Sequence, residues 1–242
     1  EDGHKMMLPI PNKKAWSPVS PFLYDVTIMY GEDFIQSYFG MRHFSVEKDS
    51  NGILRLCLNH VPYFQNGILD QGYWPESLLT PISDEAMIYD IQEAKNQGFN
   101  MIRKHCKIEP MRWYYHCDRL GMLVWQDMVN NGDYRYFRDT VLPTFFRQRK
   151  DDCKMHRDAD TRKAFLEGME ATVRQLKNHP SICYWTIFNE GWGQFDSDRV
   201  CARFRQLDDT RWVDATSGWF RRKETDVDSR HVYFRRVKLK GD

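Results

Sequence analysis

The chain has 242 residues, of which 41% are hydrophobic and 29% are charged, and its formal net charge is +1. This composition is typical of a globular protein with a sizeable core and excludes an intrinsically disordered chain. The balanced charge, without a basic block, argues against nucleic-acid binding, and no apolar run approaches the roughly 20 residues of a membrane span.

None of the six cysteines forms a CxxC pair, and several lie in apolar or helical runs, where a free cysteine behaves as a small hydrophobic residue. Buried reduced thiols favour a cytoplasmic protein. Residues 1–4 show no apolar signal segment, but they do not resemble a natural N-terminus, so a periplasmic or secreted protein stays open. The sequence also leaves a homo-oligomer open.

Residues 1–52 predict an extended lead-in and strands of an antiparallel β-sandwich. The first 21 residues are polar and contain four prolines. Apolar and polar residues then alternate with period two over 22–30, a turn follows at 31–33, and residues 34–46 form a second extended run. Two or three strands do not make a stable sandwich, so either the rest of this β domain lies outside the sequence or the hairpin packs on the α/β part of the chain.

After a short strand at 53–58, strands and helices alternate over residues 61–235. The predicted strands lie at 53–58, 61–65, 99–102, 122–125, 182–188, 212–215 and 231–234. The predicted helices run from Ser83 to Gly98, from Pro110 to Gly121, up to an end at 178–180, and over 196–207. A polar insertion is predicted at 129–158. Such alternation implies parallel strands with right-handed crossovers. No glycine-rich phosphate loop follows the first of these strands, which disfavours an open doubly wound sheet.

The predicted fold is therefore α/β: a (β/α)8 TIM-type barrel over residues 53–242, preceded by part of the antiparallel β-sandwich. Only six barrel strands can be counted, so we expect the barrel to be incomplete. The strand at 182–188 is apolar except for one threonine, which is typical of a parallel strand buried on both faces. It ends at Asn189 and Glu190. Because α/β barrels place their chemistry at the carboxyl ends of strands, Glu190 is predicted to be a catalytic acid.

The neighbours of Glu190 suggest how it would work. A general acid needs a raised pKa, and Tyr184, Trp185 and Trp192 are expected to supply an apolar wall that disfavours the ionised form. Asn189 offers both a donor and an acceptor to a sugar hydroxyl. The alternative is that Asn189 and Glu190 cap the next helix, a role that suits asparagine but not glutamate.

Further residues near the predicted strand ends are assigned to substrate binding. Asp127 and Asp70 are placed to hydrogen-bond a sugar. His105 is predicted to bind or position the substrate. Trp192 and Trp219 complete this set, because sugar-binding clefts use aromatic faces.

Two other charged residues are expected to have structural roles. Asp214 is predicted to lie inside its strand or to be paired in the core, and Arg103 is expected to pair with a barrel carboxylate. His105, Cys106 and Glu109 are close in sequence, but their spacing lacks known zinc geometry. We therefore predict no metal and no cofactor.

Several motifs carry a resemblance to a known family. They are Trp16-Ser17-Pro18 with Pro21-Phe22-Leu23-Tyr24, Phe39-Gly40-Met41-Arg42, Asn59-His60-Val61-Pro62, Asn100-Met101-Ile102-Arg103, Cys117-Asp118-Arg119-Leu120-Gly121, and Lys177-Asn178-His179-Pro180-Ser181 through Trp185 to Asn189-Glu190. Together these motifs resemble glycoside hydrolase family 2, the β-galactosidase, β-glucuronidase and β-mannosidase group. The resemblance spans nearly the whole chain, and its last motif is the most specific.

The resemblance implies roles for individual residues. Glu190 would be the general acid/base, and Asn189 would contact the sugar 2-hydroxyl. His105 resembles the family's substrate-binding histidine, and Tyr233 resembles the tyrosine that hydrogen-bonds the nucleophile. Residues 1–52 would be the end of the family's immunoglobulin-like domain.

Four features depart from the family pattern. Asn59-His60 stands where the family often has Asn-Gly, and residues 66–74 lack the histidine-rich signature of typical β-galactosidases. Trp125-Gln126-Asp127-Met128 replaces the Asp-Glu-Ala of that branch. Nothing between Glu190 and Asp242 fits the family's second glutamate, the nucleophile of the seventh strand. We therefore expect a fragment that lacks the nucleophile.

The predicted function is that of a retaining exo-β-glycosidase, β-galactosidase-like, which hydrolyses terminal β-linked sugars of an oligosaccharide or glycoside. It would use an acid/base and a nucleophile in a double displacement. A non-catalytic carbohydrate-binding or scaffold protein on the same barrel is the alternative. A barrel hydrolase that uses one carboxylate and a metal is a third hypothesis.

Overall fold

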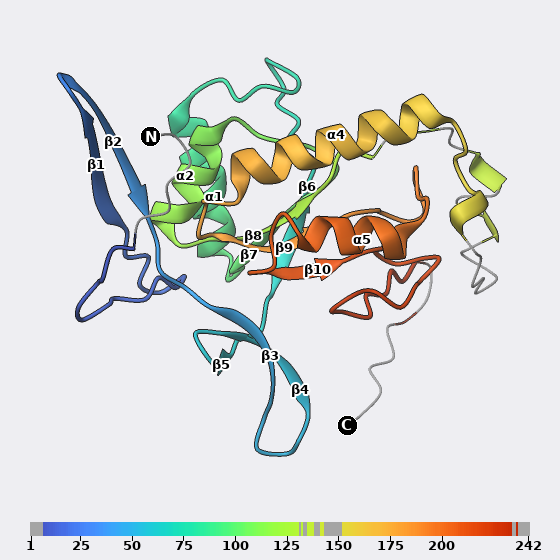
Figure 1. Cartoon of the computed structure of the whole chain (residues 1–242), viewed down its shortest axis with the longest axis horizontal. Coiled ribbons are helices and arrows are strands. Elements are labelled where there is room, and N and C mark those ends of the chain that lie inside the picture. The colour runs from blue at the N-terminus through green and yellow to red at the C-terminus, as the bar shows by residue number, and fades with distance from the viewer. Residues whose placement is uncertain are drawn as a thin grey trace.

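A computed structural model describes residues 7–130, 132, 135–137, 141–142, 152–233 and 236. Its centre is a five-stranded parallel sheet in the order β10-β9-β8-β7-β6 (Figure 1). The strands are β6 (Gly67–Asp70), β7 (Met101–Lys104), β8 (Leu123–Asp127), β9 (Ile182–Thr186) and β10 (Trp212–Asp214). The predicted α/β class with parallel strands is confirmed. Within the described ranges the five strands do not close into a barrel.

Helices connect the parallel strands. They are α1 (Asp84–Asn96), α2 (Met111–Leu120), α4 (Ala159–Leu176) and α5 (Ser197–Arg205), with a short 3-10 helix, η2 (Asp152–Lys154), in the predicted polar insertion. Two predicted signals set their ends: the Ser83 hydroxyl accepts a hydrogen bond from Ala86 N at 3.2 Å, and Gly121, with a φ of 71°, ends α2. In the part of the chain that the structure describes, no helix is both long and apolar enough to cross a membrane.

Both faces of β9 are buried, as its apolar sequence predicts. Trp185 is fully buried in the core that the sheet forms with the helices, where it lies against Phe204 with ring centroids 5.7 Å apart. Tyr184 belongs to a second core cluster and stacks on Trp125 at 4.0 Å. Burying a large apolar side chain contributes roughly 1.5–3 kcal/mol. The two clusters therefore fix β9 from both sides. The residues that follow its carboxyl end lie at the edge of the sheet.

Residues 7–62 contain two antiparallel sheets. Their strands are β1 (Tyr24–Tyr30), β2 (Asp33–Phe39), β3 (Phe44–Lys48), β4 (Leu54–Leu58) and β5 (Val61–Pro62). The β1–β2 hairpin projects from the parallel sheet, and β3, β4 and β5 form a separate sheet (Figure 1). The turn between β3 and β4 lies at the predicted boundary between 1–52 and 53–242, and the immunoglobulin-like assignment stays a prediction.

The first parallel strand differs from the predicted one at 61–65. Val61 and Pro62 pair antiparallel with β4, because the two-residue turn at Asn59 and His60 reverses the chain. The parallel strand starts only at Gly67, where Asn66 N donates to Asn100 Oδ1 at 2.9 Å. Even so, β9 is the fourth parallel strand along the chain, as predicted.

The predicted sixth strand at 231–234 is also wrong for its described residues. Residues 231–233 have no strand partner, and residue 234 lies outside the described part of the chain. The physical reason is that the side chains of His231 and Tyr233 both hydrogen-bond Glu190, so this segment crosses the carboxyl edge of the sheet.

Candidate active site

A tight turn at the end of β9 carries Glu190. Trp192 N donates to Asn189 O at 2.9 Å, and both Glu190 and Gly191 have positive φ values, 51° and 76°. A Cβ atom on Gly191 would lie 2.4 Å from the Phe220 ring, so only glycine fits there. Glu190, in contrast, holds a left-handed conformation that costs a non-glycine residue about 1–3 kcal/mol. Such strain is typical of functional sites.

The alternative in which Asn189 and Glu190 cap the next helix is wrong. That helix, α5, begins at Ser197 with Asp196 at its N-cap position. Glu190 N instead donates to Ser217 O at 2.9 Å, beyond the end of β10. The turn is therefore tied to the neighbouring strand end, and its side chains stay at the edge of the sheet.

Two donors converge on one oxygen of the Glu190 carboxylate. His231 Nδ1 lies 2.6 Å from Glu190 Oε1, and the Tyr233 hydroxyl donates to the same atom. His231 Nε2 lies 3.0 Å from Ser217 Oγ and 3.5 Å from Arg103 Nη1. Nδ1 is thus the ring nitrogen that faces Glu190, and Nε2 faces Ser217 and Arg103.

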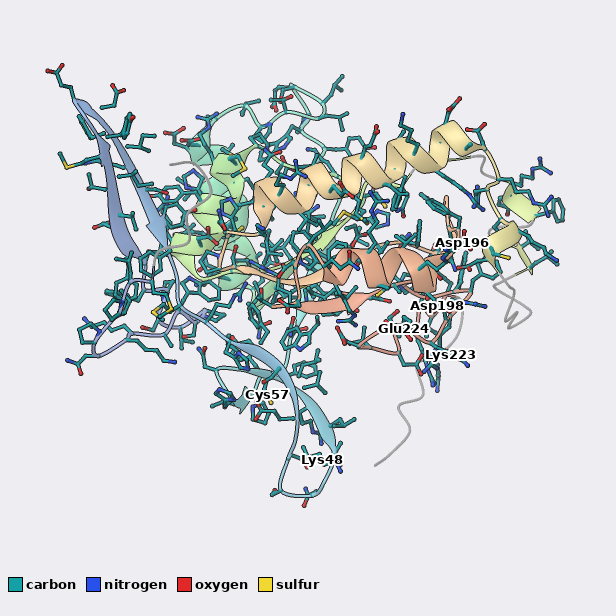
Figure 2. All side chains as sticks on the ribbon, viewed as in Figure 1. Lys48, Cys57, Asp196, Asp198, Lys223 and Glu224 are labelled. Carbon is teal, nitrogen blue, oxygen red and sulfur yellow. The ribbon has the colours of Figure 1, made fainter. Side chains whose placement is uncertain are left out.

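The loop that brings these donors is anchored to α5. Asp198 Oδ1 accepts hydrogen bonds from the backbone N of Lys223 and of Glu224, both at 3.1 Å. Figure 2 shows Lys223 and Glu224 beside the end of α5 that carries Asp198. Further along the loop, Ser229 Oγ accepts from Gly218 N at 3.0 Å. These contacts hold the loop against the strand ends that it crosses.

The prediction of a raised pKa for Glu190 is wrong. Burial does push the pKa of Glu190 upward, but the hydrogen bonds from His231 and Tyr233, with the charges of His231 and Arg103, outweigh it, and the pKa lies below its ordinary value. One part of the predicted apolar wall is also missing, since Trp185 packs among the helices and donates to Asp208 Oδ2 at 2.8 Å. Sequence shows which residues are apolar neighbours but not the directions of their side chains.

Replacing Tyr233 by phenylalanine is expected to raise the pKa of Glu190, because the change removes one of the two donors while burial remains. In the unaltered protein the lowered pKa means that ionised Glu190 stabilises the fold above its unfolded pKa, and this stabilisation is lost as the pH falls through the folded value. Carbon-13 NMR titration of the glutamate carboxyl groups, assigned with Glu190→Gln, measures the change. Tyr38→Phe, which removes a donor to Asp118 instead, is the matched control. An unchanged Glu190 pKa in Tyr233→Phe contradicts the proposed balance.

Arg103 links two further predicted site residues. Its Nε and Nη2 donate to the two oxygens of Asp127 at 3.0 and 2.9 Å, and Nη2 also donates to Asn189 Oδ1 at 2.9 Å. The prediction that Arg103 pairs with a barrel carboxylate is confirmed. Asp127 is 1% exposed, so its carboxylate is shielded from solvent, and its two oxygens accept from Arg103 as a bidentate pair. Asn189 is thereby fixed with its carbonyl toward Arg103, which turns its NH2 group to other partners.

The remaining predicted residues divide into two groups. His105 lies edge-on to Trp192, with ring centroids 6.4 Å apart, and Trp219 lies edge-on to Tyr233 at 6.3 Å. Burial lowers the pKa of His105, which favours a neutral ring. These aromatic residues therefore surround the same strand ends as Glu190.

Asp70 belongs to a different network. Its Oδ2 accepts from Lys104 Nζ at 2.5 Å and its Oδ1 accepts from Gly72 N at 2.7 Å. Lys104 is itself 1% exposed and also pairs with Glu109 at 2.9 Å. Both Asp70 oxygens are thus engaged by the protein. Among the described residues, Asp70 meets the group around Glu190 through its backbone, since His105 N donates to Asp70 O at 2.9 Å, while its carboxylate bonds Lys104 and Gly72.

His231 and Ser217 are site residues that the sequence reasoning missed. The sequence predicts a strand at the segment of His231, and it places Ser217 only as a residue beyond the strand at 212–215. The one signal that points to His231 is its spacing: it stands two residues before Tyr233, so both side chains can reach one face of an extended segment.

A metal is not favoured at the site by the residues present. The described group that brings potential ligands together is His105, Cys106 and Asp127, whose ligand atoms lie within 4.8 Å of one another. Arg103 already forms an ion pair with the Asp127 carboxylate. Burial raises the pKa of the Cys106 thiol to about 12, whereas a metal binds the thiolate. Glu109, the third member of the group considered from sequence, pairs with Lys104 and Lys107 instead.

Comparisons with known proteins bear on the family and the fold of the chain. The family model "Glycosyl hydrolases family 2, TIM barrel domain" matches residues 80–239. A β-galactosidase of Psychromonas ingrahamii is 29% identical over 93% of this chain and 20% of its own length, and one of Lactococcus lactis is 26% identical over 79% and 18%. The chain thus spans about a fifth of the length of these curated relatives.

Solved structures show the same fold. A family 2 β-galacturonidase from Eisenbergiella tayi, bound to galacturonate, superposes with a TM-score of 0.67 at 22% identity, over 86% of this chain and 34% of its own. A β-glucuronidase from Parabacteroides merdae gives a TM-score of 0.60 at 18% identity, over 84% and 24%. The predicted TIM-barrel fold and the predicted resemblance are confirmed. Because the family model covers more than half of the sequence, the chain belongs to glycosyl hydrolases family 2.

Proposed function

We propose that this chain supplies the acid/base side of a retaining exo-β-glycosidase that removes terminal β-linked sugars. The observation that supports this proposal is the Glu190 carboxylate at the carboxyl edge of the parallel sheet, held on Oε1 by His231 and Tyr233. Within the described residues, the hydrogen bonds to this carboxylate all fall on Oε1. Oε2 is therefore the oxygen that can exchange a proton with a substrate.

In the first step, protonated Glu190 would donate from Oε2 to the oxygen of the leaving group as the glycosidic bond breaks. The carboxylate that forms would be stabilised by the two donors on Oε1, and these bonds strengthen as negative charge develops. In the second step, the same carboxylate would remove a proton from water. One residue thus acts as acid and then as base.

A double displacement also needs a nucleophilic carboxylate, about 5–5.5 Å from the acid/base. Among the described residues near the site, Asp127 is bound by both arms of Arg103. Asp214 is 2% exposed and accepts from the Tyr184 hydroxyl at 3.0 Å, and burial raises its pKa. Neither is available to attack an anomeric carbon. Because the chain spans about a fifth of the length of its curated relatives, we propose that the nucleophile is a glutamate of a segment outside this sequence.

The nucleophilic carboxylate would also raise the pKa of Glu190, which the described residues alone hold below its ordinary value. A like charge within about 4–6 Å disfavours ionisation and raises the pKa of one member of a carboxylate pair. Without that second charge, the hydrogen bonds from His231 and Tyr233 favour the ionised form of Glu190. With the nucleophile ionised beside it, Glu190 would hold a proton at a higher pH and could act as the acid.

The sugar would lie against the other residues at this edge. Because Arg103 holds the Asn189 carbonyl, the Asn189 NH2 group is the donor for a sugar hydroxyl. His105 and Trp192, in edge contact, and Trp219, beside Tyr233, offer ring and aromatic surfaces around the same position. These residues would orient a terminal sugar with its glycosidic oxygen toward Glu190.

A galactoside is expected to be a better substrate than a uronide. The curated relatives from Psychromonas and Lactococcus are named β-galactosidases. Arg103, the guanidinium at the site, is already engaged by Asp127 and Asn189 and gives a uronate carboxylate no new partner. The test is turnover of nitrophenyl β-galactoside, β-mannoside, β-glucuronide and β-galacturonide by the longer protein that includes the proposed nucleophile. A tenfold preference for either uronide contradicts the substrate proposal, and an inverted product anomer contradicts the mechanism.

A non-catalytic carbohydrate-binding protein is the second candidate. It is favoured by the single usable carboxylate among the described residues near the site. This candidate predicts that the longer protein binds a galactoside, measured by calorimetry, without releasing sugar. Detectable turnover that is lost in Glu190→Gln rules it out.

A further inference from the structure

A second group of functional side chains lies at the opposite end of the sheet from Glu190. It is built on β3 and on the turn between β4 and β5, and β5 leads into the amino end of β6. Glu190 follows the carboxyl end of β9, and β6 and β9 run parallel in one sheet. The two groups are therefore separate sites. Figure 1 shows the β3–β5 sheet set apart from the parallel sheet.

Glu47 lies in β3, and His43 directly precedes that strand. Side chains at every second position of a strand share a face, so those of Ser45 and Glu47 point the same way, and the ligand atoms of His43 and Glu47 lie within 4.8 Å of each other. Phe44, on the other face, is buried against Trp212, with ring centroids 5.0 Å apart. The face that carries Ser45 and Glu47 is thus turned away from the core.

His60 reaches this face from the turn between β4 and β5. Asn59 and His60 have φ values of 53° and 67°, the conformation of a two-residue hairpin turn that favours Asn-Gly. The turn is locked to β3, because Asn59 N donates to His43 O at 2.7 Å and Asn59 Oδ1 accepts from His43 N at 3.0 Å. A histidine thus occupies the position where glycine is least strained, and its ring lies over His43.

We propose that His43, Glu47 and His60 form a binding site for a divalent transition-metal ion of the Zn²⁺ class. Their ligand atoms lie within 4.8 Å of one another. His60 Nδ1 is 2.8 Å from Glu47 Oε1, and the two imidazole rings are 4.6 Å apart. Two histidines and a glutamate, with a fourth position for water, are an established ligand set for zinc.

The exposure of His60 suits a metal ligand. The His60 side chain is 68% exposed, so its ring can turn to close the distances to about 2 Å from the ion. The ion would replace the His60–Glu47 hydrogen bond and tie the β4–β5 turn to β3.

Calorimetric titration of the metal-free 242-residue chain with Zn²⁺ tests the proposal, and one site is expected. His60→Gly is the central variant: it removes a ligand and restores the Asn-Gly sequence that this turn favours, so the protein should fold at least as well. Loss of even an outer-shell partner costs a metal site about 10–100-fold in affinity, so loss of a ligand in His60→Gly or His43→Gln should cost at least tenfold.

The control is His105→Gln, which disrupts the other described cluster of potential ligands and should leave this Zn²⁺ affinity unchanged. Melting temperatures give an independent measurement: Zn²⁺ should raise that of the unaltered chain but not that of His60→Gly. Binding that survives both His60→Gly and His43→Gln overturns the proposal. So does a chain that takes up no Zn²⁺ at millimolar concentration.

Discussion

Replacing Glu190 by glutamine is expected to lower kcat/KM for an alkyl β-glycoside by about 10²–10⁴-fold, the usual contribution of a general acid/base. Glutamine keeps the shape of the side chain and can still accept from His231 and Tyr233, but it holds no transferable proton. An alkoxide is a poor leaving group, so the first step depends strongly on that proton. Steady-state kinetics of the longer protein that includes the proposed nucleophile measure the effect.

The dependence on the leaving group separates acid catalysis from a structural role. A dinitrophenolate leaves without protonation, so formation of the glycosyl-enzyme from a dinitrophenyl glycoside should be far less impaired in Glu190→Gln than formation from the alkyl glycoside. Glu224→Gln is the matched control, because Glu224 is an exposed residue of the loop after β10 and is outside the proposed machinery. An equal loss with both substrates, measured in the pre-steady state, argues against Glu190 as the acid.

Much of the framework around Glu190 follows from local sequence. The apolar run that becomes β9, the hydroxyl of Ser83 and the glycine at 121 each act over a few residues, and the structure has each element where these signals place it. The predicted strand at 61–65 is misplaced for a related reason. A two-residue turn at Asn59 and His60 joins antiparallel strands, and this turn chemistry outweighs the apolar character of the residues after it.

The chemistry of the site depends on contacts that no local pattern contains. His231 lies 41 positions after Glu190, yet its hydrogen bond helps to reverse the predicted direction of the pKa shift. Asp70 and Asp127 look alike in sequence as carboxylates at strand ends. One is drawn to Lys104 and the other to Arg103, because neighbouring side chains along β7 point to opposite faces. The sequence therefore predicts where polar groups gather, but not which partner each one finds.

Replacing Arg211 by methionine is expected to destabilise the fold by about 3–5 kcal/mol, the usual effect of breaking a buried ion pair. The Arg211 side chain is 1% exposed and lies 2.5 Å from Asp208 Oδ2. It also donates to the backbone carbonyls of Lys177, His179 and Ile182, at 2.6, 2.9 and 2.7 Å. Methionine has similar length but leaves a buried carboxylate and three carbonyl groups without this donor.

The chain offers a matched comparison in Arg203→Met. Arg203 also pairs with a carboxylate, Glu170, but its side chain is 48% exposed, so its loss should cost at most about 1 kcal/mol. Urea unfolding of the two variants with equal m-values measures both free energies of unfolding. Because Arg211 clamps the segment that leads into β9, it fixes the strand whose far end carries Glu190. If Arg211→Met costs no more than Arg203→Met, the position of β9 depends on its apolar packing alone.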